Sequence, residues 1–174
     1  MHTNIHEVST VSIDINGIAH VQLTVSKKTS LLFWRDLLNF FNMSTLIDGE
    51  EVHYRIGGKT GVLVRLAPPE KRERRFDQDT SGLHHICFRA RSVEDVNKVS
   101  RFVEEHQHAT LVHAGEEGDK FAPGYFSVLF EDPDGIRVEV NFVPGKGHFG
   151  RGGRLGESGS GPASSYGDRG LTDD

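Results

Sequence analysis

The chain contains an internal repeat, which restricts its possible folds more than any other feature of the sequence. Residues 17–25 (GIAHVQLTV) align without a gap with residues 82–90 (GLHHICFRA). In both segments β-branched or aromatic side chains alternate with other residues in period two, which is typical of a β-strand. His20 and His85 occupy the same position in the two copies. The repeat predicts two copies of one small module.

Each of these strands is followed by a helix and then by three more strands. Residues 29–41 and 92–106 carry apolar side chains at helical spacing, and we expect Thr29 or Ser30 to cap the first helix and Ser92 the second. The later strands are expected at residues 44–47, 52–56 and 62–66 in the first half, and 110–114, 125–131 and 136–142 in the second. The sequence therefore predicts an α+β fold in which two βαβββ modules form a curved mixed sheet around a concave metal site.

The repeat also divides the chain into segments. The modules are expected at residues 17–66 and 82–143, joined by a linker rich in proline and charge at residues 67–81. Residues 1–16 form an N-terminal extension, and residues 144–174 form a tail rich in glycine and serine. Such a tail cannot bury enough apolar surface to offset its ordering entropy.

Composition excludes several classes of protein. A net charge of −5 argues against nucleic acid as the main partner, because phosphate binding needs a basic surface. No apolar run approaches the roughly 20 residues that cross a bilayer, and the N-terminus lacks the features of a secretory signal. A single cysteine, Cys87, excludes an internal disulfide. We expect a cytoplasmic protein whose partner is a small molecule, with no nucleic acid and no membrane.

Strand alternation places His20, His85 and Glu139 on the concave side of their strands, away from the helices. Two imidazoles and one carboxylate on one face of a metal leave positions open for substrate or O₂. This arrangement suits non-haem Fe(II), and Mn, Co, Ni or Zn can also bind to it. The recurrence of histidine at the same register favours a metal site over two unrelated buried histidines. Gln22 and Asn141 could orient the ligands.

Three segments also resemble the vicinal oxygen chelate superfamily, which includes glyoxalase I, extradiol dioxygenases, fosfomycin-modifying transferases and bleomycin-sequestering proteins. These segments are residues 18–21 (IAHV), 83–88 (LHHICF) and 132–140 (DPDGIRVEV). The resemblance implies the same ligands, His20, His85 and Glu139. It also implies that His84 faces the helix layer, because the second histidine of the pair is the ligand.

Arg65 bears on which member of that superfamily the chain resembles. Aligning residues 61–65 with residues 135–139 places Arg65 opposite Glu139, where glyoxalase I has a fourth ligand. Arginine has no acceptor atom and cannot bind a metal. A site with three ligands therefore resembles the dioxygenases or the fosfomycin-type transferases more closely. Arg65 could bind an anionic substrate or pair with Glu139, and the sequence leaves both open.

Four further residues are candidates for the concave side. We assign His53 and Arg55 to substrate binding, together with Arg65. His113 and Tyr125 are similar to a histidine and a tyrosine that assist proton transfer in extradiol dioxygenases, and they are the catalytic candidates.

The leading hypothesis is a metal-dependent enzyme that acts on a small oxygen-chelating substrate, as an Fe(II) dioxygenase of the extradiol type. One alternative is an O₂-independent enzyme, either a glyoxalase-like lyase or isomerase or a fosfomycin-type thiol transferase. Another is a non-enzymatic, bleomycin-like binding or resistance protein. The sequence leaves open whether the active unit is a monomer or a homodimer.

Overall fold

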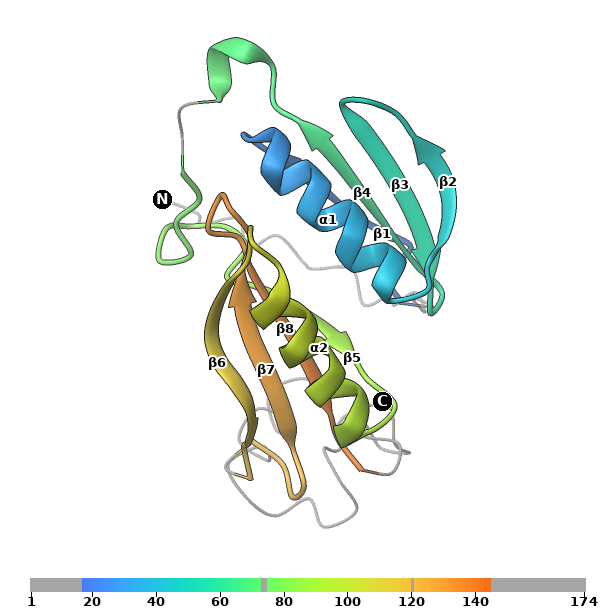
Figure 1. Ribbon diagram of the computed structural model, residues 1–174, viewed down its shortest axis with the longest axis vertical. Helices are drawn as coiled ribbons and strands as arrows, with labels where there is room; N and C mark the ends of the chain where they lie inside the picture. The colour runs from blue at the N-terminus through green and yellow to red at the C-terminus, as the bar shows by residue number, and fades with distance from the viewer. Residues whose placement is uncertain (1–16, 73–74, 120, 145–174) are drawn as a thin grey trace, which may run out of the picture.

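The computed structural model describes residues 17–72, 75–119 and 121–144 (Figure 1). The first half contains β1 (His20–Val25), α1 (Lys28–Phe40), β2 (Ser44–Asp48), β3 (Val52–Gly57) and β4 (Thr60–Leu66), followed by a 3₁₀ turn at Pro69–Lys71. The second half contains β5 (Ile86–Arg89), α2 (Val93–Glu105), β6 (Thr110–Glu117), β7 (Phe126–Glu131) and β8 (Arg137–Phe142). The predicted α+β class and the two βαβββ modules are confirmed. The predicted N-terminal extension, and the predicted tail after Pro144, lie outside the described residues.

The strands form two four-stranded sheets, with the orders β1-β4-β3-β2 and β5-β8-β7-β6. In each sheet the first and last strands of the module pair in parallel, and the other pairs are antiparallel. A parallel pair needs a long crossover, which the helix and two strands provide. Across the described part of the chain, the curved mixed sheet of the prediction is divided into two sheets that are not hydrogen-bonded to each other.

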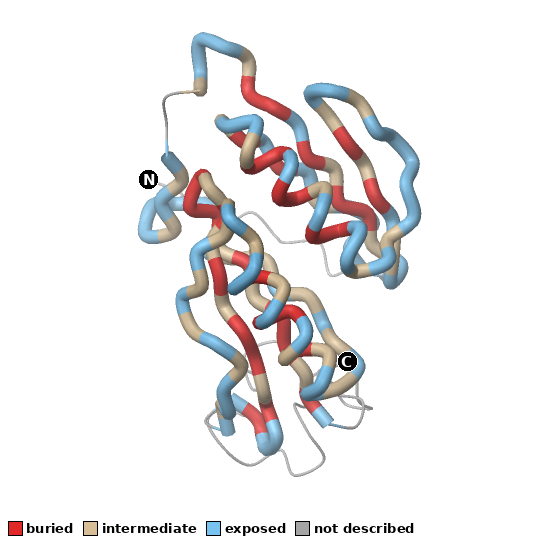
Figure 2. Tube along the Cα trace, in the orientation of Figure 1, coloured by how far each residue is buried: buried red, intermediate tan, exposed pale blue. Residues whose placement is uncertain are grey.

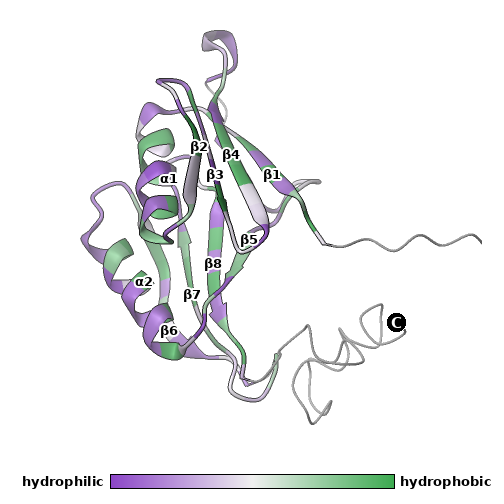
Figure 3. Cartoon of the chain, turned by 90° about the vertical axis from the view of Figure 1, so that its right-hand side faces the viewer, coloured by the Kyte–Doolittle hydropathy of each residue, from purple (hydrophilic) through white to green (hydrophobic). Residues whose placement is uncertain are grey.

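Each helix covers one face of its own sheet and leaves the other face open. Figure 3 shows α1 and α2 on the same side of the molecule, with the uncovered faces of both sheets turned away from them. Strand residues that face the helices are buried and alternate with more exposed neighbours (Figure 2). In the first module these buried strand residues are Leu23, Val25, Val62, Val64 and Leu66. The open faces are therefore the available surfaces for a site.

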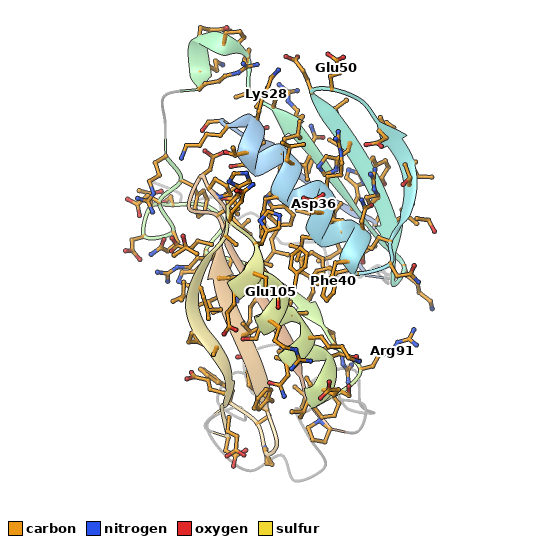
Figure 4. All side chains as sticks on the ribbon, in the orientation of Figure 1. Lys28, Asp36, Phe40, Glu50, Arg91 and Glu105 are labelled. Carbon is orange, nitrogen blue, oxygen red and sulfur yellow. The ribbon has the colours of Figure 1, made fainter. Side chains whose placement is uncertain are left out.

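Aromatic side chains join the two modules on the helix side. Phe33 of α1 meets Phe130 of β7 edge to face, with ring centroids 6.1 Å apart. Phe40, at the C-terminal end of α1 (Figure 4), stacks on Phe102 of α2, with ring centroids 4.5 Å apart. Buried residues of both modules belong to one hydrophobic cluster. The helix side thus forms a continuous core between the modules.

The turn between β7 and β8 adds polar contacts to this junction. Asp134 accepts hydrogen bonds from the backbone N–H of Ser26 (2.5 Å) and of Lys27 (3.3 Å), and from the Ser26 hydroxyl. Asp132 accepts a hydrogen bond from the indole N–H of Trp34 at 2.9 Å. Both aspartates are buried. The second module therefore holds the start and the middle of α1.

The two helices begin in different ways. Ser92 caps α2 as predicted, because its hydroxyl accepts the backbone N–H of Asp95 at 3.1 Å. The predicted cap of α1 at Thr29 or Ser30 is wrong, since the helix begins earlier and Ser30 is buried within it. Asp134 of the other module instead holds the backbone N–H groups of Ser26 and Lys27, just before the helix. Each helix has 13 residues, and none in the described ranges is long and apolar enough to span a membrane.

Candidate metal centre

The open face of the second sheet carries a row of aligned side chains. The register pairs Cys87 with Glu139, Glu139 with Leu129, and Leu129 with His113. Val138, next to Glu139 in β8, is fully buried toward α2. Because neighbouring strand residues point to opposite faces, the row of Glu139 lies on the face that α2 leaves open.

His85 meets Glu139 on this face. Its Nε2 lies 3.1 Å from Glu139 Oε2. Its other ring nitrogen, Nδ1, lies 2.7 Å from Nδ1 of His84. The prediction that His84 faces the helix layer is wrong, because His84 is exposed and contacts His85. The reason is that β5 begins only at Ile86, so the alternation of a strand does not extend to His84.

Tyr125 and Asn141 hold the other oxygen of Glu139. The Tyr125 hydroxyl donates to Glu139 Oε1, and Asn141 Nδ2 donates to the Tyr125 oxygen at 3.1 Å. Tyr125 and Asn141 are both buried. Of the two catalytic candidates, Tyr125 is the one that the structure brings into contact with Glu139.

The charges of this cluster suit a cation. Burial of the Glu139 carboxyl opposes its ionisation, but hydrogen bonds from His85 and Tyr125 outweigh that effect and lower the pKa of Glu139. Burial, together with the hydrogen bond to Glu139, raises the pKa of Tyr125 above its usual range. At neutral pH the carboxylate is therefore ionised and the phenol protonated, as a carboxylate ligand and its hydrogen-bond donor require.

His20 lies outside this cluster. It is the first residue of β1, is exposed, and pairs through its backbone with Gly61 of β4. Among residues 17–72, 75–119 and 121–144, no three His, Cys, Asp or Glu side chains converge closely enough to hold a metal. Of the three predicted ligands, the structure brings His85 and Glu139 together and leaves His20 apart.

The geometry of His85 and Glu139 fits two ligands of one metal. Ligands bound at right angles, each about 2.1 Å from the ion, lie about 3 Å apart. The separation of 3.1 Å between His85 Nε2 and Glu139 Oε2 matches this value. A histidine ligand also commonly has its second nitrogen held by a neighbour, as His84 holds His85 here.

The structural counterpart of Glu139 in the first module is Leu63. β1 pairs with β4 in the same parallel manner as β5 pairs with β8. The residue two positions after His85 pairs with Glu139, and the residue two positions after His20 pairs with Leu63. An aliphatic side chain cannot bind a metal, so this position supplies no fourth ligand.

Arg65 therefore does not occupy the position that the glycine alignment assigned to it. Gly61 lies inside β4, whereas Gly135 lies in the turn before β8, so matching the two glycines shifts the register by two residues. Arg65 is exposed and makes no hydrogen bond or ion pair with any described residue. Its proposed pairing with Glu139 is absent from the described chain, where Glu139 contacts His85 and Tyr125 instead.

His53 and Arg55 lie on the opposite face from the one predicted. His53 is fully buried, with Nε2 3.0 Å from the carbonyl oxygen of Leu31 in α1, and its burial lowers the pKa of its ring. Arg55 is also buried and pairs with Asp48 at 3.3 Å. The register explains this placement, because His53 pairs with Val64, which faces α1. Both polar side chains support the helix and do not line the open face.

His113 shares the open face with Glu139 but is separated from it by β7. Its Nδ1 lies 3.0 Å from the carbonyl oxygen of Ala114 and 3.7 Å from Glu116 Oε1. It thus lies at the rim of the face, two strands away from β8.

Comparison with known proteins assigns the family. The family model of the Glyoxalase/Bleomycin resistance protein/Dioxygenase superfamily matches residues 17–140. The chain belongs to this superfamily, and the resemblance noted in its sequence is confirmed.

Solved structures agree with this assignment. A putative glyoxalase from Bacillus halodurans is 25% identical with a TM-score of 0.62, over 73% of this chain and 96% of that chain. A glyoxalase/dioxygenase from Nostoc punctiforme is 15% identical (TM-score 0.58; 79% and 100% covered). A lactoylglutathione lyase from Agrobacterium tumefaciens is 20% identical (TM-score 0.52; 74% and 95% covered). The last two show similarity of fold alone. No curated protein matched the chain.

Proposed function

We propose that the protein is a metal-dependent enzyme that acts on a small substrate with vicinal oxygens, as an Fe(II) dioxygenase of the extradiol type. The observation that carries the proposal is the contact between His85 Nε2 and Glu139 Oε2, at the separation of neighbouring metal ligands. His85 and Glu139 would hold the metal, and His20, the repeat counterpart of His85, would be the third ligand.

When bound, the metal would act as a Lewis acid on the vicinal oxygens of the substrate and lower their proton affinity. The protein's own residues have separate roles in this proposal. Tyr125 is a positioning residue, because it occupies one oxygen of Glu139 and turns the other toward His85. Asn141 fixes the Tyr125 hydroxyl. His113, on the same open face, exchanges a proton with the substrate.

The register favours a dioxygenase over a lyase of the glyoxalase I type. Leu63 stands where a fourth ligand would lie, so the protein supplies at most three ligands through these strands. A metal held by three ligands keeps positions open for both a chelating substrate and O₂.

Metal analysis and O₂ uptake test the proposal. Protein purified without air and freed of metal is loaded with Fe(II), Mn(II), Co(II), Ni(II) or Zn(II), and bound metal and O₂ consumption with catechol are measured. We expect about one metal ion per site and O₂ uptake with Fe(II). Glu139→Gln should lower the metal affinity by more than about 100-fold, since loss of a ligand should exceed loss of a ligand's partner. Glu94→Gln, on α2 far from the open face, is the matched control.

His20 is tested in the same assay. We propose that a homodimer brings His20 of one copy to His85 and Glu139 of the other. His20→Ala and His85→Ala should each lose metal, and a refolded mixture of the two should recover about a quarter of the wild-type capacity, because half of the dimers then contain one intact site. No recovery in a mixture proven to exchange subunits would place all three ligands in one chain. Absence of metal in the wild type would reject the enzyme and favour a binding protein.

A further inference from the structure

The open faces of the two sheets differ in chemistry. The face of β1–β4 opposite α1 has polar side chains on β1 and mostly apolar ones on β3 and β4, among them Ile56, which is 40% exposed. The register places Leu63 between Gln22 and Tyr54 on this face. On the second sheet the corresponding face carries Glu139 and its hydrogen-bonded neighbours. The first module thus presents an apolar surface beside the position of His20.

Tyr54 lies across Gly61 on this apolar surface. A side chain at residue 61 would overlap the ring and hydroxyl of Tyr54. Gly61 pairs directly with His20. The missing side chain therefore lets the Tyr54 ring lie along the sheet, with its hydroxyl pointing toward the strand that carries His20. That hydroxyl makes no hydrogen bond to any residue the structure describes.

Arg65 adds a positive charge to the same surface, and among the described residues it has no hydrogen-bond or ion-pair partner. It lies on β4 between Thr24 and Val52, which are both uncharged. The other two arginines of this module both form ion pairs with the carboxylate of Asp48. Arg35 lies 3.1 Å from it and Arg55 lies 3.3 Å from it. An unpaired guanidinium next to an apolar surface is complementary to a molecule with an apolar body and an anionic end.

The spacing of these groups suits one small molecule. Gly61 and Arg65 are four residues apart in β4, or about 13 Å along the strand. Tyr54 and Leu63 lie between them. A ring resting on Tyr54 would leave its oxygens on the His20 side and an acidic substituent on the Arg65 side.

We propose that this face selects the substrate, and that the substrate is an aromatic acid whose carboxylate pairs with Arg65 while its ring packs on Tyr54 and Leu63. The inference rests on the proposed function, because the vicinal oxygens of that ring are the groups that the metal would chelate. Arginine binds a carboxylate through two parallel hydrogen bonds, which fixes orientation as well as charge.

Two probes that differ only by a carboxylate test the inference. Full-length protein loaded with Zn(II), which prevents turnover, is titrated calorimetrically with 3,4-dihydroxybenzoate and with catechol. The wild type should bind the acid at least about tenfold more tightly than catechol, since charge-assisted hydrogen bonds are strong. Arg65→Gln should abolish that preference and leave catechol binding unchanged. Arg91→Gln is the control, because Arg91 lies on the other module (Figure 4).

Tyr54 is tested by two routes. Tyr54→Ala removes the ring, and Gly61→Ala displaces it without changing the phenol. Both should weaken both probes to a similar extent and keep the preference for the acid, with metal affinity unchanged. Thermal unfolding of each variant shows whether it is folded.

The outcomes separate this inference from the proposed function. Equal binding of the two probes to the metal-loaded wild type, an unchanged preference in Arg65→Gln, or no binding of either probe overturns the inference and leaves the metal site standing. If the wild type holds no metal, the proposed function fails, and the probes are compared on the metal-free protein. A preference that depends on Arg65 would still support this face as the anion site, and its absence would overturn that as well.

Discussion

The two modules share one order of elements, but the second is self-contained and the first is completed by the second. α2 is capped by Ser92 of its own module, whereas the residues just before α1 are held by Asp134 from across the junction. Trp34 of α1 likewise donates to Asp132 of the other module. The first module therefore depends on contacts that it cannot make alone.

The open faces of the two sheets also differ between the modules. In the second module, Glu139 already has His85 on one oxygen and Tyr125 on the other. In the first module, His20 is exposed and Leu63 occupies the position that corresponds to Glu139. The two copies of the module thus differ in the chemistry of their open faces, although they share one order of elements.

The largest effect is expected from breaking the hydrogen bonds that Asp134 makes between the modules. Asp134→Ala removes a buried carboxylate that accepts three hydrogen bonds, at Ser26 and Lys27, and should lower the free energy of unfolding by about 3 to 4 kcal/mol. Ser92→Ala removes a local cap with one hydrogen bond, and should cost about 1 kcal/mol. Urea unfolding measures both. Equal losses would mean that the first module does not depend on the second for its helix.

A smaller effect is expected in the pH dependence of the free energy of unfolding, through Asp132. Burial raises the pKa of Asp132 to about 6 from an ordinary value of 3.8. Between these two values the folded state binds more protons than the unfolded state, so this group lowers stability as pH rises from about 4 to 6 and adds no further slope above 6. At about 1.4 kcal/mol per pKa unit, the change is on the order of 2 to 3 kcal/mol. Asp132→Asn should lack this slope when unfolding free energies are compared from pH 4 to 7.

Asp95 provides the opposite control for the pH experiment. Its carboxyl is exposed, and its hydrogen bonds with Lys98 and Ser92 lower the pKa of Asp95. A lowered pKa contributes stability above the unfolded value that is lost as pH falls. Asp95→Asn should therefore leave the falling slope between pH 4 and 6 in place. If the stability of Asp132→Asn still falls as the pH rises from 4 to 6, another group titrates at the junction.

The sequence predicted those parts of the fold that depend on local pattern. The repeat gave the order of the elements, and the Ser92 cap follows from a local motif of four residues. The contact before α1 could not be predicted in this way, because Asp134 lies in the other module. His53 and Arg55 were assigned by their polarity, but the register turns them toward α1, where His53 Nε2 meets the Leu31 carbonyl and Arg55 donates to Asn39.

The candidate site shows the same limit. The repeat marked His20 and His85, strand alternation added Glu139, and pairing in the sheet was needed to find the counterpart of Glu139. A glycine in a strand and a glycine in a turn look alike in an alignment, so Gly61 was matched to Gly135. The register moved the counterpart from Arg65 to Leu63. Tyr54 was missed because only its position over Gly61 distinguishes it.

The smallest expected effect tests the assignment of Leu63 as the counterpart of Glu139. The substitution would make the two modules alike at this position. Leu63→Glu places a carboxylate at the register of Glu139, and should tighten binding of a divalent metal by about tenfold, because affinity rises with the number of charged ligands. Arg65→Glu makes a larger change of charge only two residues away, about 7 Å along the strand. It should nevertheless tighten metal binding far less, because residue 65 pairs with Thr24, whereas the position that corresponds to Glu139 pairs with Gln22. Competition with a metal-binding dye measures both affinities. A gain in Arg65→Glu without one in Leu63→Glu would restore the glycine alignment and reject the register as the guide to the fourth position.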